Sequence, residues 1–157
     1  MRTLLYTARL FIPLKVNLMT TLVFGHKSPD TDSTGSPLIW EWFLNHTGID
    51  AKAVLLGTPN TEAAFAAKRW GFDLPEVIAD VEDDQSCVIV DTNNPAELPA
   101  NINNADVLAI IDHHKLAGGL ETKNPINITI RPLACTATIM HQMMGDHAGH
   151  MPDAIKG

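Results

Sequence analysis

The sequence predicts an α/β fold in which a parallel β-sheet is covered by helices on both faces. Two observations carry this prediction. Short runs of β-branched and aliphatic residues alternate along the chain with segments whose apolar residues recur at helical spacing. The strand segments are also continuously apolar, which is typical of strands that are buried on both faces of a parallel sheet.

The apolar runs predict the strands of this sheet. They lie at residues 21–24, 51–56, 77–78, 86–90 and 107–111. The first run leads through Gly25 and His26 into a loop rich in Pro, Asp, Ser and Gly, which favours a turn over regular structure. The runs at 86–90 and 107–111 end at Asp91 and Asp112. Each of these three strands therefore presents a polar side chain at its carboxyl end.

Helical spacing of apolar residues predicts helices at residues 36–45, 61–70 and 134–144. Gly48 helps to end the first of them. Residues 152–157 have the composition of the opening of a further helix. We expect one domain over residues 19–157, truncated at its C-terminus.

Composition and charge indicate a soluble globular protein and exclude several classes of partner. The 157 residues are 45% hydrophobic and 18% charged, as in ordinary globular domains. The net charge of −7 argues against nucleic acid and membrane surfaces, which are bound mainly through clustered Lys and Arg. No apolar run approaches the ~20 residues that cross a bilayer. We expect a cytoplasmic location, and an anionic substrate would need metal ions.

Residues 1–18 form a leader of unknown role in this interpretation. They contain Arg2, Arg9 and Lys15 and no acidic residue, which is a feature of targeting segments. However, Arg9 interrupts the apolar stretch, and no small-residue cleavage site follows it. A secretory signal is therefore not expected, and Met19 could serve as a second start.

Three clusters of acidic and imidazole side chains follow the predicted strands. They are His26 with Asp30 and Asp32, then Asp91, and then Asp112 with His113 and His114. Since ligand sites of open α/β sheets lie beyond the carboxyl ends of the strands, we expect the clusters to converge. Converging carboxylates repel unless divalent cations lie among them. This donor set suits Mn²⁺, Fe²⁺, Co²⁺ or Zn²⁺, and two ions that share a carboxylate can activate water for attack on a phosphoryl group.

Each cluster has an ordinary structural interpretation when taken alone. A single Asp at a strand end more often caps a helix or a turn than binds a ligand. Three clusters in one short chain favour a metal site instead. The remaining histidines have no acidic partner at ligand spacing and are interpreted as surface residues; they are His46, His141, His147 and His150.

Five motifs resemble those of a known superfamily. They are Gly-His-Lys-Ser-Pro-Asp-Thr-Asp-Ser at 25–33, Leu-Gly-Thr-Pro-Asn-Thr-Glu at 56–62, Asp-Thr-Asn-Asn at 91–94, Ile-Asp-His-His-Lys at 111–115 and Ala-Cys-Thr-Ala-Thr-Ile at 134–139. The first and fourth resemble the DHH phosphoesterases. Together with the other three, they are similar to manganese-dependent (family II) inorganic pyrophosphatases.

The resemblance implies hydrolysis of diphosphate to two phosphates by a hydroxide that two Mn²⁺ or Co²⁺ ions activate, with Mg²⁺ accompanying the substrate. By motif, His26 and Asp30 would bind one ion, Asp32 and His113 the other, and Asp91 both. His114 would contact the substrate phosphate, and Asp112 would orient the histidines. The resemblance also leaves a homodimer open.

The family pattern continues beyond residue 157 with a further aspartate and a basic second domain, so we expect this chain to be a weakly active or inactive fragment. Two alternatives stay open. A DHH exonuclease or oligonucleotide phosphodiesterase would share the metal clusters but would need a basic groove. A non-catalytic metal-binding module would bind metal without releasing phosphate.

Overall fold

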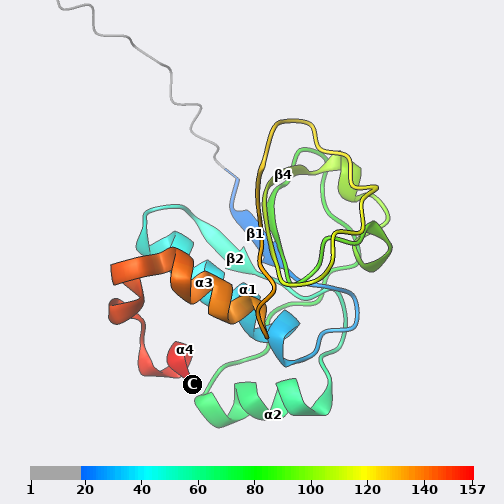
Figure 1. Ribbon diagram of the computed structural model, residues 1–157. Helices are drawn as coiled ribbons and strands as arrows, with labels where there is room; N and C mark the ends of the chain where they lie inside the picture. The colour runs from blue at the N-terminus through cyan, green and yellow to red at the C-terminus, as the bar shows by residue number, and fades with distance from the viewer. Residues whose placement is uncertain (1–18) are drawn as a thin grey trace, which may run out of the picture.

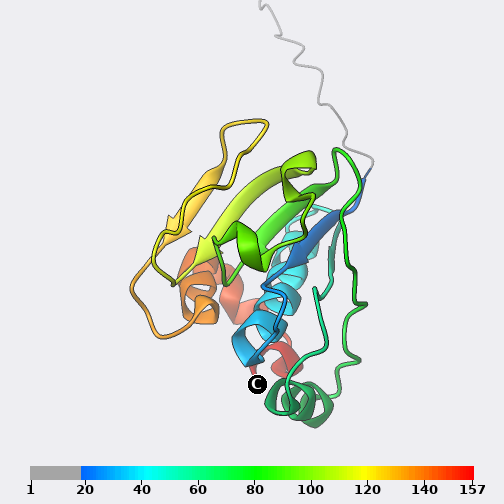
Figure 2. The same ribbon diagram turned by 90° about the vertical axis from the view of Figure 1, so that its right-hand side faces the viewer.

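The computed structural model describes residues 19–157, and its centre is a five-stranded parallel sheet. The strands are β1 (Thr21–Phe24), β2 (Ala51–Ala53), β3 (Ser86–Val90), β4 (Asp106–Asp112) and β5 (Asn127–Ile130). Their order across the sheet is β2-β1-β3-β4-β5, and every pairing is parallel (Figure 2). The predicted parallel α/β fold is confirmed.

The α-helices lie on one side of this sheet. Helices α1 (Thr31–His46) and α3 (Thr136–Met144) lie side by side against the same face of the sheet, and α2 (Thr61–Trp70) packs beside α1 (Figure 1). A short helix, α4 (Asp153–Lys156), follows near the end of the chain.

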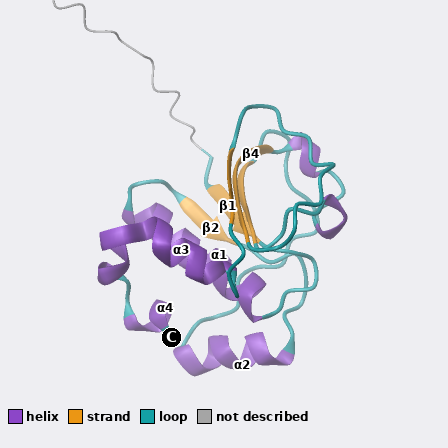
Figure 3. Ribbon diagram, in the orientation of Figure 1, coloured by secondary structure: helices purple, strands orange, loops and turns teal. Residues whose placement is uncertain are grey.

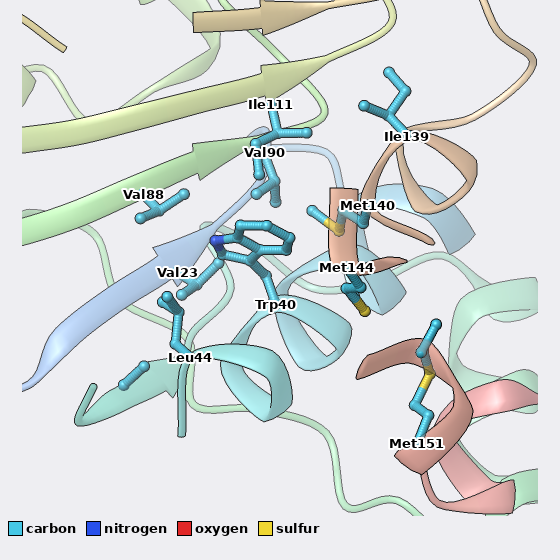
Figure 4. Packing of buried hydrophobic residues seen from close by; sticks show 12 residues of the cluster. Val23, Trp40, Leu44, Val88, Val90, Ile111, Ile139, Met140, Met144 and Met151 are labelled. Carbon is cyan, nitrogen blue, oxygen red and sulfur yellow. The ribbon is translucent and has the colours of Figure 1, made fainter. Parts of the chain in front are cut away.

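A buried apolar cluster joins α1 and α3 to the sheet. Trp40 of α1 lies between the strand residues Val23 and Val90 and Met140 of α3 (Figure 4). Each Å² of apolar surface that these side chains bury contributes about 25 cal/mol of stabilisation. The cluster therefore holds both helices on the sheet. The N-termini of α1 and α3 are thereby held at the carboxyl ends of the strands.

The opposite face of the sheet carries loops and two short 3₁₀ helices, η1 (Pro95–Glu97) and η2 (Ile102–Asn104) (Figure 3). Their apolar residues Leu98 and Ile102 pack on Phe24, Ile89 and other strand residues in a second buried cluster. Helices therefore occur on both faces, as predicted, but those on the second face are single turns.

Helix α1 begins five residues before the predicted start. Residues 28–35 are rich in Pro, Asp, Ser and Gly, and Gly35 is a poor helix former, so a loop was the expected structure. In the structure, the Asp30 side chain accepts a hydrogen bond from the Ser33 N–H and caps the helix. Ser33 and Ser36 are fully buried, so tertiary packing outweighs local propensity here.

The strand predictions miss one strand and overstate two others. β5 was not predicted, because it is an edge strand with exposed positions and its residues alternate Asn-Ile-Thr-Ile instead of forming an apolar run. The predicted strand at 77–78 is an isolated bridge from Val77 to Leu55, and β2 is half as long as the run at 51–56.

Within residues 19–157, no helix is long and apolar enough to cross a membrane. The interpretation of residues 1–18 as a leader lies outside the described residues.

Candidate metal centre

The order of the strands places the predicted site. The chain runs from β1 outward to β2 and then returns to β3 on the other side of β1, so the topology reverses between β1 and β3. Ligand sites of open α/β sheets lie at such a reversal, beyond the carboxyl ends of the strands. His26 follows β1 and Asp91 follows β3. The three predicted clusters do meet at this edge.

One group of ligand atoms forms around His26. Its Nε2 lies 3.5 Å from Asp91 Oδ2 and 3.9 Å from Asp30 Oδ1. The nearby Asp91 carboxylate raises the pKa of His26, in spite of partial burial, which acts in the opposite direction. The His26 backbone N–H donates to Ser33 Oγ over 2.8 Å, so α1 holds this residue in place.

A second group forms around His113 and His114, which follow β4. Asp91, His113 and His114 offer ligand atoms that all lie within 4.8 Å of one another. His113 Nε2 lies 3.2 Å from Asp91 Oδ1 and 3.6 Å from Asp32 Oδ2. Its other ring nitrogen, Nδ1, lies 3.1 Å from the Leu133 carbonyl oxygen. That contact favours the tautomer that carries its proton on Nδ1, which leaves Nε2 free as a ligand.

Asp91 belongs to both groups, and its backbone and burial are both unusual. It has a φ of 59°, a left-handed conformation that few residues other than glycine adopt. Its side chain is 1% exposed, and Oδ1 accepts a hydrogen bond from Thr136 Oγ1 over 3.1 Å. Burial raises the pKa of Asp91, and the nearby Asp32 carboxylate raises it further.

Asp91 Oδ2 is buried, and no group of residues 19–157 donates a hydrogen bond to it. An unsatisfied buried carboxylate oxygen is costly, and a cation is a natural partner for it. The donors around it are carboxylate oxygens and imidazole nitrogens without a thiolate, a set that suits Mn²⁺ and similar divalent ions. The residues present therefore fit divalent cations.

Helix α3 holds the Asp32 carboxylate by its N-terminus. Oδ2 accepts from the Thr136 N–H over 2.7 Å, and Oδ1 accepts from the Ala137 N–H over 3.2 Å. Unpaired N–H groups at a helix N-terminus favour an anion there. Ser36 Oγ also donates to Oδ1, so the orientation of Asp32 is fixed from two helices.

Asp112 orients the histidines that follow it. Its Oδ1 accepts from the backbone N–H groups of His113 and His114 and lies 2.8 Å from His114 Nδ1. Burial opposes ionisation of Asp112, but the hydrogen bonds from His114 and Asn93 outweigh it and lower the pKa of Asp112. Conversely, burial of His114 is outweighed by Asp112, so the pKa of His114 is raised.

Two residues of the site were not singled out from the sequence for a role of their own. Thr136 contacts Asp91 and Asp32, and Asn93 contacts Asp112. Each stands in a motif, yet a Thr or an Asn in a loop is an ordinary helix cap or turn residue. Only the three-dimensional contacts distinguish them.

Comparisons with known proteins identify the family of the chain. The sequence model of the DHH family, N-terminal domain, matches residues 20–156. The probable manganese-dependent inorganic pyrophosphatase of Lactobacillus acidophilus is 35% identical over 136 residues, which are 86% of this chain and 43% of that protein. The corresponding protein of Shouchella clausii is 35% identical over 138 residues, 87% of this chain and 44% of that protein. The chain thus spans less than half the length of these relatives.

Two solved structures are also similar. A putative family II inorganic pyrophosphatase of Methanococcus jannaschii matches with a TM-score of 0.71 and 32% identity over 80% of this chain and 39% of that one. An exopolyphosphatase-related protein of Bacteroides fragilis matches with a TM-score of 0.56 and 18% identity over 80% of this chain and 38% of that one, which shows the fold alone. Fold, motifs and similarity to manganese-dependent pyrophosphatases agree: the chain belongs to the DHH family, in the region of its N-terminal domain.

Proposed function

We propose that this chain is the metal-binding part of a manganese-dependent inorganic pyrophosphatase, which hydrolyses diphosphate to two phosphates. The observation that carries the proposal is the position of Asp91 between two groups of ligand atoms. Its Oδ2 faces His26 Nε2 at 3.5 Å, and its Oδ1 faces His113 Nε2 at 3.2 Å. A carboxylate with one oxygen toward each group is suited to bridging two cations.

In this proposal, five residues hold the metal. His26 and Asp30 bind one cation, Asp32 and His113 bind the other, and Asp91 binds both. Two divalent cations at such a site supply an activated water and neutralise charge on the phosphoryl group. The relatives named above are manganese-dependent, and Co²⁺ is an alternative with similar ligand preferences. Mg²⁺ would enter with the diphosphate.

His114 and Asp112 act on the substrate side of the proposed site. Half of the His114 side chain is exposed, and its Nδ1 is held by Asp112 Oδ1. The raised pKa of His114 favours the protonated ring, which can donate a hydrogen bond to a phosphate oxygen. Asp112, which is fully buried, keeps that ring in one orientation.

Among the described residues, the ion pairs with the carboxylates of the site all come from histidines. Since phosphoryl transfer depends on positive groups around the transferred phosphate, we propose that residues 1–157 alone turn over diphosphate weakly or not at all.

The experiment is phosphate release from diphosphate after Mn²⁺ loading, with Mg²⁺ present, by the wild-type chain and Asp91→Ala. Weak release that Asp91→Ala abolishes would support the proposal. A chain without release that still binds two Mn²⁺ would be consistent with the metal-binding part of a larger enzyme. Release that is unchanged in Asp91→Ala would contradict the assignment of the site.

A further inference from the structure

Three of the histidines that the sequence placed on the surface lie together in the structure. His46 is the last residue of α1, and His147 and His150 belong to the 3₁₀ helix η3 (Gly145–His150), which follows α3. The ring centroids of His46 and His147 are 5.4 Å apart, and those of His46 and His150 are 5.7 Å apart. All three residues are exposed.

The fold explains why these rings meet. Ala148 and Met151 are buried in the cluster beneath α1 and α3, so η3 is anchored by its apolar side. Residues three apart in a 3₁₀ helix lie on the same side of it, which aligns His147 with His150. Since α1 packs beside α3, its C-terminal residue His46 faces them.

Two aromatic side chains limit the freedom of the rings. The Trp42 ring stacks on His46 with centroids 5.0 Å apart and an angle of 15° between the planes. The Phe43 ring meets His147 edge-on, with centroids 5.8 Å apart. This packing keeps the His46 and His147 rings on one patch of the surface, so less side-chain entropy is lost when they bind a ligand.

We propose that His46, His147 and His150 form a second metal site, which binds a late first-row divalent cation such as Ni²⁺ or Zn²⁺. A ligating nitrogen lies ~2.0–2.1 Å from such an ion, so the nitrogens of two ligands are roughly 3–3.5 Å apart. The ring nitrogens of His46, His147 and His150 do not all lie within 4.8 Å of one another in the structure, so binding would require the exposed rings to turn towards a shared ion. Water would complete the coordination.

The proposed site differs from the Asp91 site in chemistry and in place. All of its protein ligands are imidazoles, which suit Zn²⁺, Cu²⁺ and Ni²⁺, whereas the carboxylates around Asp91 suit Mn²⁺. Asp32 and His46 lie at opposite ends of α1, separated by 14 residues of helix, or about 21 Å at ~1.5 Å per residue. The two sites can therefore be occupied independently.

The test compares Ni²⁺ binding by the wild-type chain, His46→Ala, His147→Ala and His150→Ala, all without a histidine tag, near pH ~7.5, where imidazole is mostly neutral. His141→Ala is the matched control, because His141 is an exposed histidine of α3 outside the cluster. Equilibrium dialysis gives the number of Ni²⁺ bound per chain. Ni²⁺ that enters the Asp91 site is common to all five proteins and cancels in the comparison.

We expect wild type and His141→Ala either to bind one Ni²⁺ more than each cluster variant or to bind that ion at least about tenfold more tightly. Removing a ligand should weaken binding at least as much as removing a residue outside the ligand set, which typically lowers metal affinity about tenfold or more. Circular dichroism and Mn²⁺ stoichiometry establish that each variant is folded with its Asp91 site intact. Equal number and affinity in His46→Ala and His141→Ala would overturn the proposal. A loss confined to one of the three cluster variants would also overturn a three-histidine site.

Discussion

Asn93 Nδ2 donates a hydrogen bond to Asp112 Oδ2 over 2.5 Å and thereby ties the loop after β3 to the end of β4. The same amide group donates to the Lys115 carbonyl oxygen and accepts from the Ala117 N–H. One buried side chain thus connects Asp91, two residues before it, with the loop that carries His113 and His114.

We expect Asn93→Ala to lower the free energy of unfolding by about 1–3 kcal/mol, because it leaves the buried Asp112 oxygen and the Ala117 N–H without their partner. Urea unfolding measures this change. Asn103→Ala is the control, since Asn103 is exposed and accepts only a long hydrogen bond of 3.4 Å from the Glu121 N–H. Equal loss of stability in the two variants would contradict the structural role of Asn93.

We expect Thr136 to support Mn²⁺ affinity through its contacts with Asp91 and Asp32. Its hydroxyl donates to Asp91 Oδ1, while its backbone N–H holds Asp32. Thr136→Val keeps the shape and the backbone contact but removes the hydroxyl, so Mn²⁺ should bind about 10–100-fold more weakly. Thr136→Ser keeps the hydroxyl and should bind Mn²⁺ nearly as wild type does. Calorimetric titration with Mn²⁺ decides, and tight binding by Thr136→Val would rule out this role.

Gly25 and Gly35 should respond in opposite directions to replacement by alanine. A Cβ at Gly25 would overlap Ser33 Oγ and lie 2.9 Å from the Ser33 carbonyl oxygen, whereas a Cβ at Gly35 meets nothing within 4 Å. We expect Gly25→Ala to cost about 1–3 kcal/mol or more through overpacking. Gly35→Ala, inside α1, should stabilise by about 0.5–1 kcal/mol. Thermal unfolding of both variants tests this, and a stable Gly25→Ala would contradict the close packing of β1 against α1.

We expect the protein to lose stability at alkaline pH because the Cys87 thiol is buried. Burial raises the pKa of this thiol to about 12, from an ordinary value near 9.0. Below pH ~9 the thiol is protonated in both the folded and the unfolded state. Above pH ~9 only the unfolded chain releases the proton. The free energy of unfolding should therefore fall by up to about 1.4 kcal/mol per pH unit as the pH rises towards 12.

The Cys87→Ala variant should lose this part of the pH dependence, and Cys135→Ala should retain it. Urea unfolding between pH ~8.5 and ~10.5 measures the slopes. Below pH ~9, a thiol reagent should modify the partly exposed Cys135 of the folded protein and leave the buried Cys87 unmodified. Slopes that agree between wild type and Cys87→Ala would contradict the prediction.

The sequence predicted the parallel sheet and the meeting of the three clusters, because buried parallel strands leave continuous apolar runs and share one carboxyl edge. It could not predict that α1 begins at Thr31, since burial of Ser33 and Ser36 overrides the weak propensity of Gly35. The contact of Thr136 with Asp91, 45 residues away along the chain, depends on the packing of α3.

His46, His147 and His150 show the same limit of sequence-based prediction. Apart in sequence, they have the pattern of unrelated surface residues, and only the packing of η3 beside α1 brings them together. Local pattern identifies the ends of strands well, but it does not indicate which surface residues become neighbours.

The central claim is that Asp91 bridges two cations, and counting bound Mn²⁺ tests it most directly. Asn tolerates the left-handed backbone of this position, so Asp91→Asn should fold while it loses one carboxylate oxygen and its charge. We predict two tightly bound Mn²⁺ per wild-type chain, and at most one, more weakly bound, in folded Asp91→Asn. Two Mn²⁺ bound to Asp91→Asn as tightly as to wild type would contradict the bridging role and, with it, the two-cation centre.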